Sequence, residues 1–377
     1  MPNRIYIRPI GFPPNPQSEA RSPTGEAESV RLAGGMVHAS RFAIILRRDN
    51  AVIQRDIVPP SGVADVLARL PDDAAADGHR QWAALRSAHP PLQLGDRTIR
   101  LDQPQIMGIL NVTPDSFSDG GAFLDDPEEG RAHASAMLEA GAAIVDIGGE
   151  STRPGAAAVW EGDEIERVRP ATEYCAAMGA AISVDTRRPA VMEAALGAGA
   201  QMINDVSALR HDPRSLEIVA RAAVPVILMH APGDGDNLHA DGVYDNVVFD
   251  VFDWLNARRD AAIAAGVKQE NIVLDPGIGF GKSLADNLAL LNALALFHAL
   301  GQPLMLGASR KRMIGALSNE APAAERLGGS LALAVAGMNA GVQLLRVHDV
   351  AATVQARNVW RGLRDAALTD FSEMAGD

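Results

Sequence analysis

The hydrophobic pattern of the chain becomes regular near Gln105. From there to the end, short runs rich in Val, Ile and Leu alternate with Ala-rich stretches of helical spacing. Short, continuously apolar runs are typical of parallel strands that are buried on both faces. The pattern predicts eight such strands, at residues 106–110, 143–147, 181–184, 201–204, 225–229, 272–274, 303–306 and 343–346. Eight strand–helix units in about 270 residues predict an α/β protein with a (β/α)8, or TIM, barrel.

A doubly wound open sheet is the alternative architecture for alternating strands and helices. The sequence argues against it, because no GxGxxG motif follows the first strand and polar clusters follow nearly every strand rather than one switch point. In a barrel, functional residues lie on the loops at the carboxyl ends of the strands. We therefore expect the active site at that end.

In our interpretation the chain has two units. Residues 1–100 form a small α+β N-terminal extension of unknown role, and residues 101–377 form the main domain. Residues 1–100 hold 13 arginines against 10 acidic residues, whereas residues 101–377 hold 21 basic and 37 acidic residues. Residues 11–29, rich in Pro, Ser and Glu, are expected to be loop or disordered. The pattern also predicts a strand at 4–8, a hairpin of 42–46 and 51–57 around Asp49-Asn50, and short helices at 62–70 and 79–88.

Composition excludes several classes of protein. The net charge of −13 over 377 residues argues against nucleic acid and anionic membranes as partners. The single cysteine, Cys175, cannot form an internal disulfide and fits a reducing compartment. The N-terminus lacks an apolar segment of signal-peptide length, and no run of about 18 apolar residues occurs. We therefore expect a cytoplasmic protein.

Three polar residues at strand ends indicate a site for a flat polar ligand. Asp185, Asn204 and Asp275 follow adjacent or nearly adjacent strands, so their side chains are expected to converge. Carboxylates and a carboxamide accept and donate hydrogen bonds along the edge of a heterocycle such as an aminopyrimidine. Each residue alone is as often a loop cap or a structural carboxylate, and it is their joint occurrence that favours a binding site.

Other strand ends carry groups suited to an anion. Arg153 and Arg346 offer forked hydrogen bonds to phosphate oxygens, and His348 adds a donor whose charge depends on its surroundings, so a diphosphate leaving group would suit them. The segment 309–312 opens a helix after the seventh strand, where backbone N–H groups and Lys311 would face an anion or an electron-rich ring.

The segment Gly108–Gly121, GILNVTPDSFSDGG, runs from a buried strand into a loop broken by Pro114 and two glycines. Asn111 at the strand end offers a neutral oxygen, which suits a Mg²⁺ that keeps most of its waters and its phosphate ligands. We expect a fixed anchor at Asn111 followed by a mobile cover. No His/Cys cluster has zinc spacing, and His230 is expected to pack or to form a hydrogen bond.

With these residues the chain resembles the dihydropteroate synthase family, the folate-pathway enzymes that sulfonamides inhibit. The resemblance runs from about residue 104 to 363 and rests on several independent segments in order: GILNVTPDSFSDGG, DIGGESTRPGA, SVDT, INDVSAL, LMH, VLDPGIGFGK, GASRKRMIG and RVHDV. It covers the main domain and leaves residues 1–100 outside, where typical members begin only shortly before the NVTPDSF strand.

The resemblance implies a transferase that joins 6-hydroxymethyl-7,8-dihydropterin diphosphate to 4-aminobenzoate with Mg²⁺, releasing 7,8-dihydropteroate and diphosphate, and that dimerises through its C-terminal barrel helices. The implied pterin site is Asp185, Asn204, Met229, Asp275, Lys311 and Arg346. The implied diphosphate site is Asn111, Thr152, Arg153, Arg346 and His348, with Asn111 as the metal contact. The implied 4-aminobenzoate pocket is Thr152, Arg153, Pro154, Phe280, Ser309 and Lys311. The catalytic set is Asn111, Asp115, Asp185, Lys311 and Arg346.

Within this reading, residues 111–121 and 151–157 fold over the substrates, and Asp115 is our candidate for stabilising the electron-poor pterin CH₂ group. One departure from the family is Ala-Pro-Gly after His230, where many members carry a Gln. Two other functions stay open: a catalytically weak pterin-binding paralogue, and a methyltetrahydrofolate-dependent corrinoid methyltransferase, which would have no use for a diphosphate clamp. For the extension we consider a packing cap, a folding aid and a docking surface for another folate enzyme, in that order.

Overall fold

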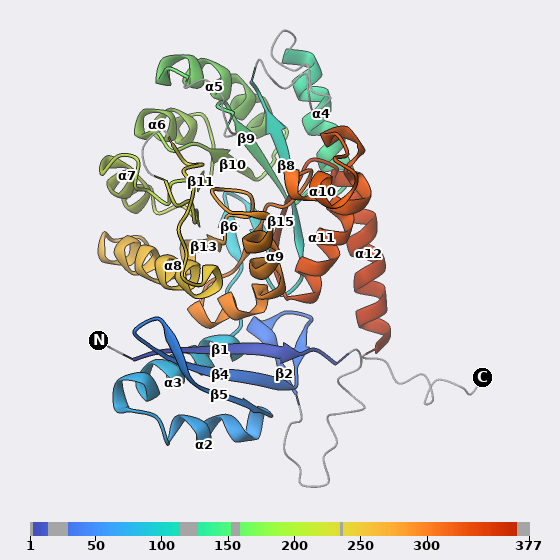
Figure 1. Ribbon diagram of the computed structural model, residues 1–377. Helices are drawn as coiled ribbons and strands as arrows, with labels where there is room; N and C mark the ends of the chain where they lie inside the picture. Colours follow the sequence, from blue (N-terminus) through green and yellow to red (C-terminus); the bar gives the residue numbers. More distant parts are fainter. Residues whose placement is uncertain (1–2, 14–28, 114–126, 152–158, 234–236, 368–377) are drawn as a thin grey trace, which may run out of the picture.

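The protein is an eight-stranded parallel barrel with a smaller unit packed against its side (Figure 1), and the computed structural model describes residues 3–13, 29–113, 127–151, 159–233 and 237–367. The sheet order is β13-β12-β11-β10-β9-β8-β15-β14, and a bridge between Leu274 and Leu304 closes it. All eight predicted strands are confirmed, as β8 Gln105–Asn111, β9 Ile144–Gly148, β10 Ile182–Asp185, β11 Met202–Asp205, β12 Val226–Met229, β13 Ile272–Asp275, β14 Met305–Leu306 and β15 Leu344–Val347.

The seventh strand, β14, is shorter than the predicted 303–306. Pro303 has no N–H group, and the Leu304 N–H donates to Gln343 Oε1 at 2.9 Å rather than to a neighbouring strand. Only Met305 and Leu306 therefore pair regularly with β15.

Helices surround the strands, and side-chain caps begin two of them. The Asn246 side chain accepts from Val248 N and Phe249 N at the start of α8, and Ser283 forms a capping box with Asp286 at the start of α9. No helix in the described ranges is long and apolar enough to cross a membrane. The helices of the barrel are α4 Pro127–Glu139, α5 Glu161–Ala177, α6 Pro189–Gly197, α7 Arg214–Ala222, α8 Val247–Ala264, α9 Leu284–Asn292, α10 Arg312–Leu317, α11 Leu327–Asn339 and α12 Val350–Ala367, with 3₁₀ turns η4 Gln269–Asn271, η5 Leu294–Leu300 and η6 Ala323–Glu325.

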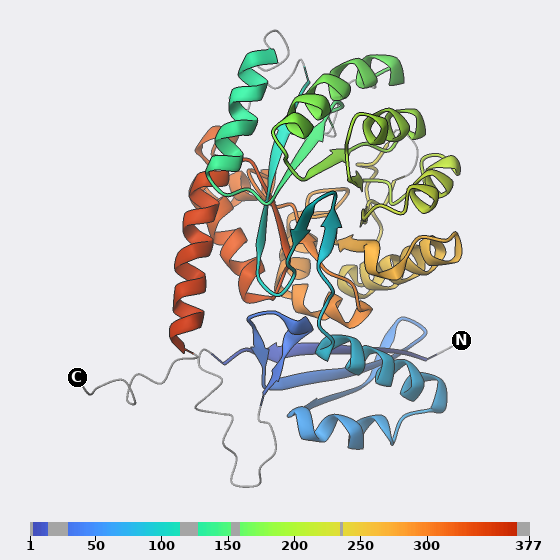
Figure 2. The same cartoon turned by 180° about the vertical axis from the view of Figure 1, so that it is seen from behind.

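A hairpin closes the amino-terminal end of the barrel. It consists of β6 Leu92–Leu94 and β7 Arg97–Ile99, and lies in front of the barrel strands when the molecule is seen from behind (Figure 2). Leu92, Leu94 and Ile99 are buried in one apolar cluster with residues from seven of the eight barrel strands and with Ala181, which immediately precedes β10. The end opposite the hairpin is left for the polar strand ends.

The N-terminal unit is an antiparallel sheet with two helices. Its sheet has the order β1-β4-β5, formed by β1 Arg4–Gly11, β4 Arg41–Arg48 and β5 Ala51–Val58. The predicted hairpin is confirmed, and its turn residues Asp49 and Asn50 have φ of 48° and 65°, the left-handed conformation that a two-residue hairpin requires. The remaining elements are β2 Val30–Arg31, η1 Leu32–Gly34, β3 His38–Ala39, η2 Pro60–Gly62, α2 Val63–Leu67 and α3 Asp72–Arg86.

The α3 helix begins seven residues before the predicted 79. Pro71 precedes it and Asp72 and Asp73 occupy its first turn, where acidic side chains favour a helix start. The α3 helix packs closely against α2, because a Cβ added at Gly78 would lie 2.5 Å from a Leu67 methyl group. Of the segment 11–29 expected to be loop, residues 14–28 lie outside the described residues.

The N-terminal unit and the barrel share one hydrophobic core. The Tyr6 ring lies 4.3 Å from Phe249 and 5.4 Å from Phe252 of α8, and the Tyr6 hydroxyl donates to Asp253 at 2.8 Å. Arg8 donates to the Asn292 carbonyl at 2.7 Å. Packing against the barrel is thus a role that the extension performs, while the division of the chain at residue 100 stays a prediction.

Candidate active site

Arg346 of β15 lies at the centre of the polar strand ends. Its Nε donates to Asp146 Oδ2 at 2.6 Å and its Nη2 donates to Asp185 Oδ2 at 2.8 Å. Asn204 Nδ2 donates to the same Asp146 oxygen at 3.1 Å. Three of the predicted residues are therefore brought together, and Asp146, which sequence reasoning assigned no role, joins them.

The electrostatic state of this group follows from its burial. Burial raises the pKa of Asp185 to about 7, with Arg346 opposing the shift and the Asp146 charge adding to it. The charges of Asp146 and Asp185 raise the pKa of Arg346 against the effect of burial, so its guanidinium stays ionised. Asp146 is fully buried, and its Oδ1 has no hydrogen-bond partner among the described residues.

Asp275 and Lys311 form the second part of the site. Burial raises the pKa of Asp275, whose Oδ1 accepts from Gly277 N at 2.8 Å. Burial lowers the pKa of Lys311 to about 8, with the charge of Asp275 opposing the shift. The Lys311 ammonium lies 4.3 Å from the centre of the Phe280 ring, close enough for a cation–π contact.

Ser309 and His348 are directly linked. The Ser309 hydroxyl oxygen accepts from the backbone N–H of His348 at 3.2 Å and lies 3.1 Å from His348 Nδ1. Burial lowers the pKa of His348 to about 3, and the nearby Arg346 and Arg310 charges act in the same direction. A neutral imidazole that accepts the Ser309 O–H at Nδ1 carries its proton on Nε2.

Asn111 ends β8 beside Gly148. Its Oδ1 would lie 3.2 Å from a Cβ at position 148, so a side chain there would crowd the amide. In the described part of the chain no group of three or more His, Cys, Asp or Glu side chains is arranged to hold a metal. A metal at this end would receive one neutral protein oxygen and take its other ligands from water or substrate.

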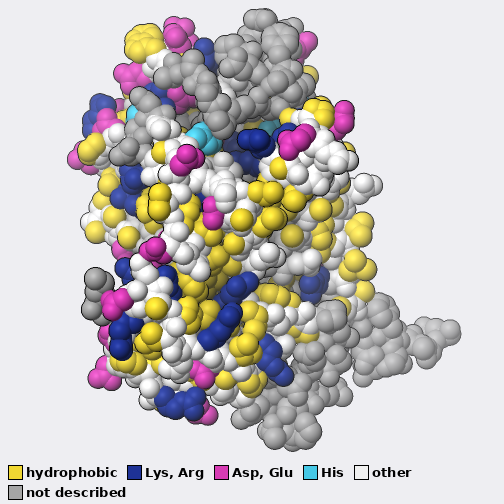
Figure 3. Space-filling view, in the orientation of Figure 1, with side chains coloured by type: hydrophobic (Ala, Val, Ile, Leu, Met, Phe, Trp, Pro, Cys, Tyr) yellow, Lys and Arg dark blue, Asp and Glu magenta, His cyan; other side chains and the backbone are white. Residues whose placement is uncertain are grey.

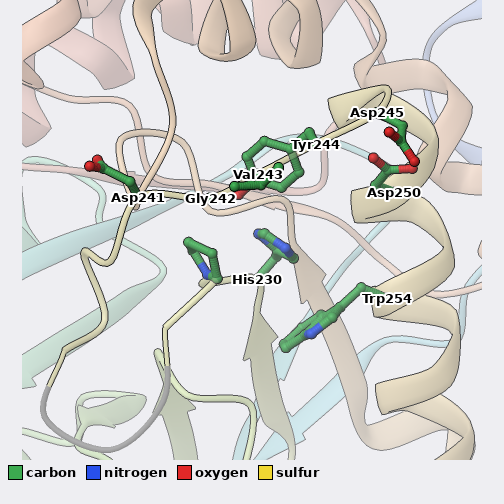
Figure 4. Close-up of a pocket in the computed structure, with 9 residues that line it drawn as sticks. His230, Asp241, Gly242, Val243, Tyr244, Asp245, Asp250 and Trp254 are labelled. Atoms are coloured by element: carbon green, nitrogen blue, oxygen red, sulfur yellow. The ribbon is translucent and has the colours of Figure 1, made fainter.

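Met229 ends β12 and His230 follows it, and the two side chains have different neighbours. Met229 is buried with Val206 and Phe280 in a small apolar cluster near the site. The His230 ring lies 4.8 Å from Trp254 and lines a cavity of about 420 Å³ with Tyr244 on the side of the loop after β12 (Figure 4). The expectation that His230 packs or forms a hydrogen bond is confirmed, since its ring packs on Trp254 and its Nδ1 contacts Lys282 Nζ at 2.9 Å.

Comparisons with known proteins identify the family. The family model described as pterin binding enzyme matches residues 107–348. The dihydropteroate synthase of Neisseria meningitidis serogroup B is 47% identical over 276 residues, 72% of this chain and 96% of that protein. A solved structure of Xanthomonas albilineans dihydropteroate synthase with 4-aminobenzoic acid has a TM-score of 0.68 at 48% identity, covering 74% of this chain and 99% of the other. A Yersinia pestis dihydropteroate synthase structure with a sulfonamide drug has a TM-score of 0.69 at 43% identity, covering 73% and 99%.

The chain belongs to the dihydropteroate synthases of the pterin-binding enzyme family.

Four of the residues assigned to a dihydropteroate synthase site, Asp115, Thr152, Arg153 and Pro154, lie outside the described residues. The other assigned residues lie at the carboxyl end of the barrel. In Figure 3, histidine and basic side chains lie near one another in the upper part of the molecule, away from the N-terminal unit. The roles of individual residues stay predictions.

Two carboxylates of this dihydropteroate synthase were missed as functional candidates. Asp146 interrupts the apolar run of β9, which is the sequence signal that could have identified it. Glu150 accepts from Arg188 Nη2 at 2.8 Å and from Val159 N at 3.3 Å. The Glu150 carboxylate thereby links Val159 to Arg188. No motif in the sequence indicates this contact.

Proposed function

We propose that this dihydropteroate synthase binds the pterin ring between Asp185, Asn204, Asp275 and Lys311 and clamps the diphosphate from the Arg346 side. One observation supports the proposal most directly. The Arg346 guanidinium binds both the Asp146 and the Asp185 carboxylates and remains a cation at this end of the barrel. Carboxylates at Asp185 and Asp275 can accept from the N–H groups of an aminopyrimidine edge, and Met229 supplies an apolar surface for the ring face.

The diphosphate side consists of Arg346, His348 and Asn111. Arg346 offers permanent positive charge, and His348 offers an Nε2–H donor. Asn111 fits Mg²⁺ because its single neutral oxygen leaves the remaining positions to water and phosphate oxygens. When bound, Mg²⁺ would neutralise the charge that develops on the leaving diphosphate. Thr152 and Arg153 complete this side in our proposal.

The 4-aminobenzoate pocket is proposed between Phe280, Ser309 and Lys311, with Thr152, Arg153 and Pro154 across it. Since the aniline nitrogen is a fair nucleophile in its neutral form, no side chain has to remove a proton before the attack. The pterin CH₂ group becomes electron-poor as the C–O bond to diphosphate breaks, and the bond's electron pair leaves with diphosphate. The aniline nitrogen then forms the new C–N bond and loses a proton to the released diphosphate or to solvent. The protein therefore has two tasks, which are to stabilise the diphosphate and to keep water from the cation. Asp115 is proposed to stabilise that cation.

We also propose a homodimer in the cytoplasm, formed through the last barrel helices. Val359 and Leu363 of α12, four residues apart on one helix, are exposed by 62% and 69%. Large exposed apolar side chains that adjoin on a helix surface are typical of a protein interface. Light scattering on the full-length protein would give twice the chain mass if this face pairs, and a Leu363→Glu variant should then be monomeric.

The direct test of function is to incubate the purified protein with both substrates and to measure dihydropteroate and diphosphate with and without Mg²⁺. We expect equal amounts of the two products, and a large loss of rate when the metal is removed by a chelator. Tight pterin binding without product would instead indicate the weak paralogue. Methyl transfer from methyltetrahydrofolate to a corrinoid protein would indicate the other enzyme class.

A further inference from the structure

Lys282 is one of three lysines in the chain, and its ammonium group is held by backbone carbonyls. Lys282 Nζ donates to Gly277 O at 2.8 Å, to Phe280 O at 3.1 Å and to His230 O at 3.3 Å. It also contacts His230 Nδ1 at 2.9 Å. No carboxylate of the described residues forms an ion pair with it. An ammonium ion with this set of acceptors fixes backbone rather than balancing a charge.

The turn that Lys282 binds is rich in glycine, so its own sequence does little to restrict its conformation. Gly277, Gly279 and Gly281 have φ of 69°, 85° and 54°, and glycine loses the most conformational freedom when it is fixed. A Cβ on Gly277 would lie 1.9 Å from the His230 carbonyl oxygen, so the turn approaches the end of β12 very closely. Lys282 reaches across this contact and binds both segments.

The same turn carries Phe280 into the site. The Phe280 ring stacks on His239 with centroids 4.8 Å apart, and the Lys311 Nζ lies 4.3 Å from the centre of the same ring. Because the Phe280 carbonyl is bound by Lys282, the position of the ring depends on that hydrogen bond.

Lys282 also contacts the His230 side chain, with 2.9 Å between Nζ and Nδ1. Burial lowers the pKa of Lys282 to about 7, and burial together with the Lys282 charge lowers the pKa of His230, so the imidazole is neutral. The imidazole then packs edge-on against Trp254 at 4.8 Å, beside Tyr244, in the cavity wall shown in Figure 4. The ends of β12 and β13 are thus joined through one side chain.

We propose that Lys282 is a positioning residue for the second substrate, which sets the Phe280 ring in the 4-aminobenzoate pocket by binding the carbonyl oxygens of residues 277 and 280. This inference rests on the proposed assignment of Phe280 to that pocket. Lys282 is assigned to neither substrate. Of the proposed pterin acceptors, Asp185 and Asn204 lie on other strands, and Asp275 bonds to the turn only through Gly277 N. The removal of Lys282 should therefore weaken 4-aminobenzoate more than pterin.

The test is steady-state kinetics on the full-length protein with Lys282→Met, which keeps the length of the side chain and removes its donors. We expect KM for 4-aminobenzoate to rise at least about tenfold, the size expected for buried carbonyls left without donors. KM for the pterin diphosphate should rise by a clearly smaller factor, because only one of its proposed acceptors, Asp275, bonds to this turn. Lys268→Met is the matched control, since Lys268 is exposed, and it should behave as the wild type.

A double-mutant cycle separates positioning from general loss of structure. If Lys282 acts through Phe280, then Lys282→Met should add little to the effect of Phe280→Ala, because residues in one pathway are not additive. Full additivity, or an equal rise of both KM values, would overturn the proposal. Should Lys282→Met fail to fold, Lys282→Gln in the same cycle gives the same two outcomes. Absence of product from the wild type would refute the proposed function instead.

Discussion

Replacing Tyr6 with Ala tests whether the N-terminal unit and the barrel fold as one body. Tyr6 is 0% exposed, and its ring and hydroxyl contact three residues of α8. Truncating a buried aromatic side chain costs about 3–5 kcal/mol. Tyr6→Phe removes only the hydroxyl, and we expect a cost of about 1 kcal/mol, because Asp253 keeps Arg4 as a partner and 26% of its side chain is exposed.

The assay is urea unfolding followed by far-UV circular dichroism and tryptophan fluorescence. Trp82 lies in α3 and Trp254 lies in α8, so fluorescence reports on both units. We expect one transition whose midpoint falls in Tyr6→Ala with an unchanged slope. Ile57→Ala is the control, since Ile57 of the same sheet is 59% exposed and should change the free energy of unfolding by less than about 0.5 kcal/mol. An early partial transition that leaves the remaining midpoint unchanged would refute the reasoning.

Three further outcomes are expected. Arg346→Lys removes the fork that spans Asp146 and Asp185, so kcat/KM should fall about 100-fold or more in a product assay, with the fold unchanged by circular dichroism. Asp146→Asn keeps the shape but loses the negative charge, and kcat/KM should fall about tenfold or more, with a smaller loss being evidence against an orienting role. His298 is neutral in the fold because burial lowers its pKa to about 4, whereas unfolded histidine titrates near 6.5. The unfolded state therefore binds more protons at acid pH, and between pH 7 and 5 the free energy of unfolding should drop by roughly 2 kcal/mol from this residue. A His298→Gln variant should show a shallower pH dependence in urea titrations at pH 5, 6 and 7.

The barrel strands were predictable from the sequence because each is a short apolar run that is buried on both faces. The strand ends were predictable for the same reason, since a polar residue that stops such a run must lie at an end of the barrel. The helix α3 was placed too late, because its first turn is Asp-Asp-Ala and shows no apolar periodicity. Its start is set by Pro71 and two acidic residues, which are weaker signals than a hydrophobic stripe.

Contacts between distant side chains could not be read in this way. Sequence reasoning places Asp185 and Arg346 at one end of the barrel, but only the structure shows that one guanidinium serves both Asp146 and Asp185. Lys282 is a similar case. Its place after a glycine-rich turn does not indicate which atoms it binds, whereas the structure shows its protons directed to the carbonyls of the turn itself.

The segment η5 explains why the extension belongs to this barrel. Its seven residues, LALFHAL, are all buried, so it has no polar face for solvent. An outer helix of a barrel normally keeps one polar face, and a segment that is apolar all round requires a second covering layer. Here β1 and α3 of the N-terminal unit supply that layer. The sequence therefore contained a signal for the role of residues 1–100, and it lay at Leu294–Leu300 in the barrel rather than in the extension itself.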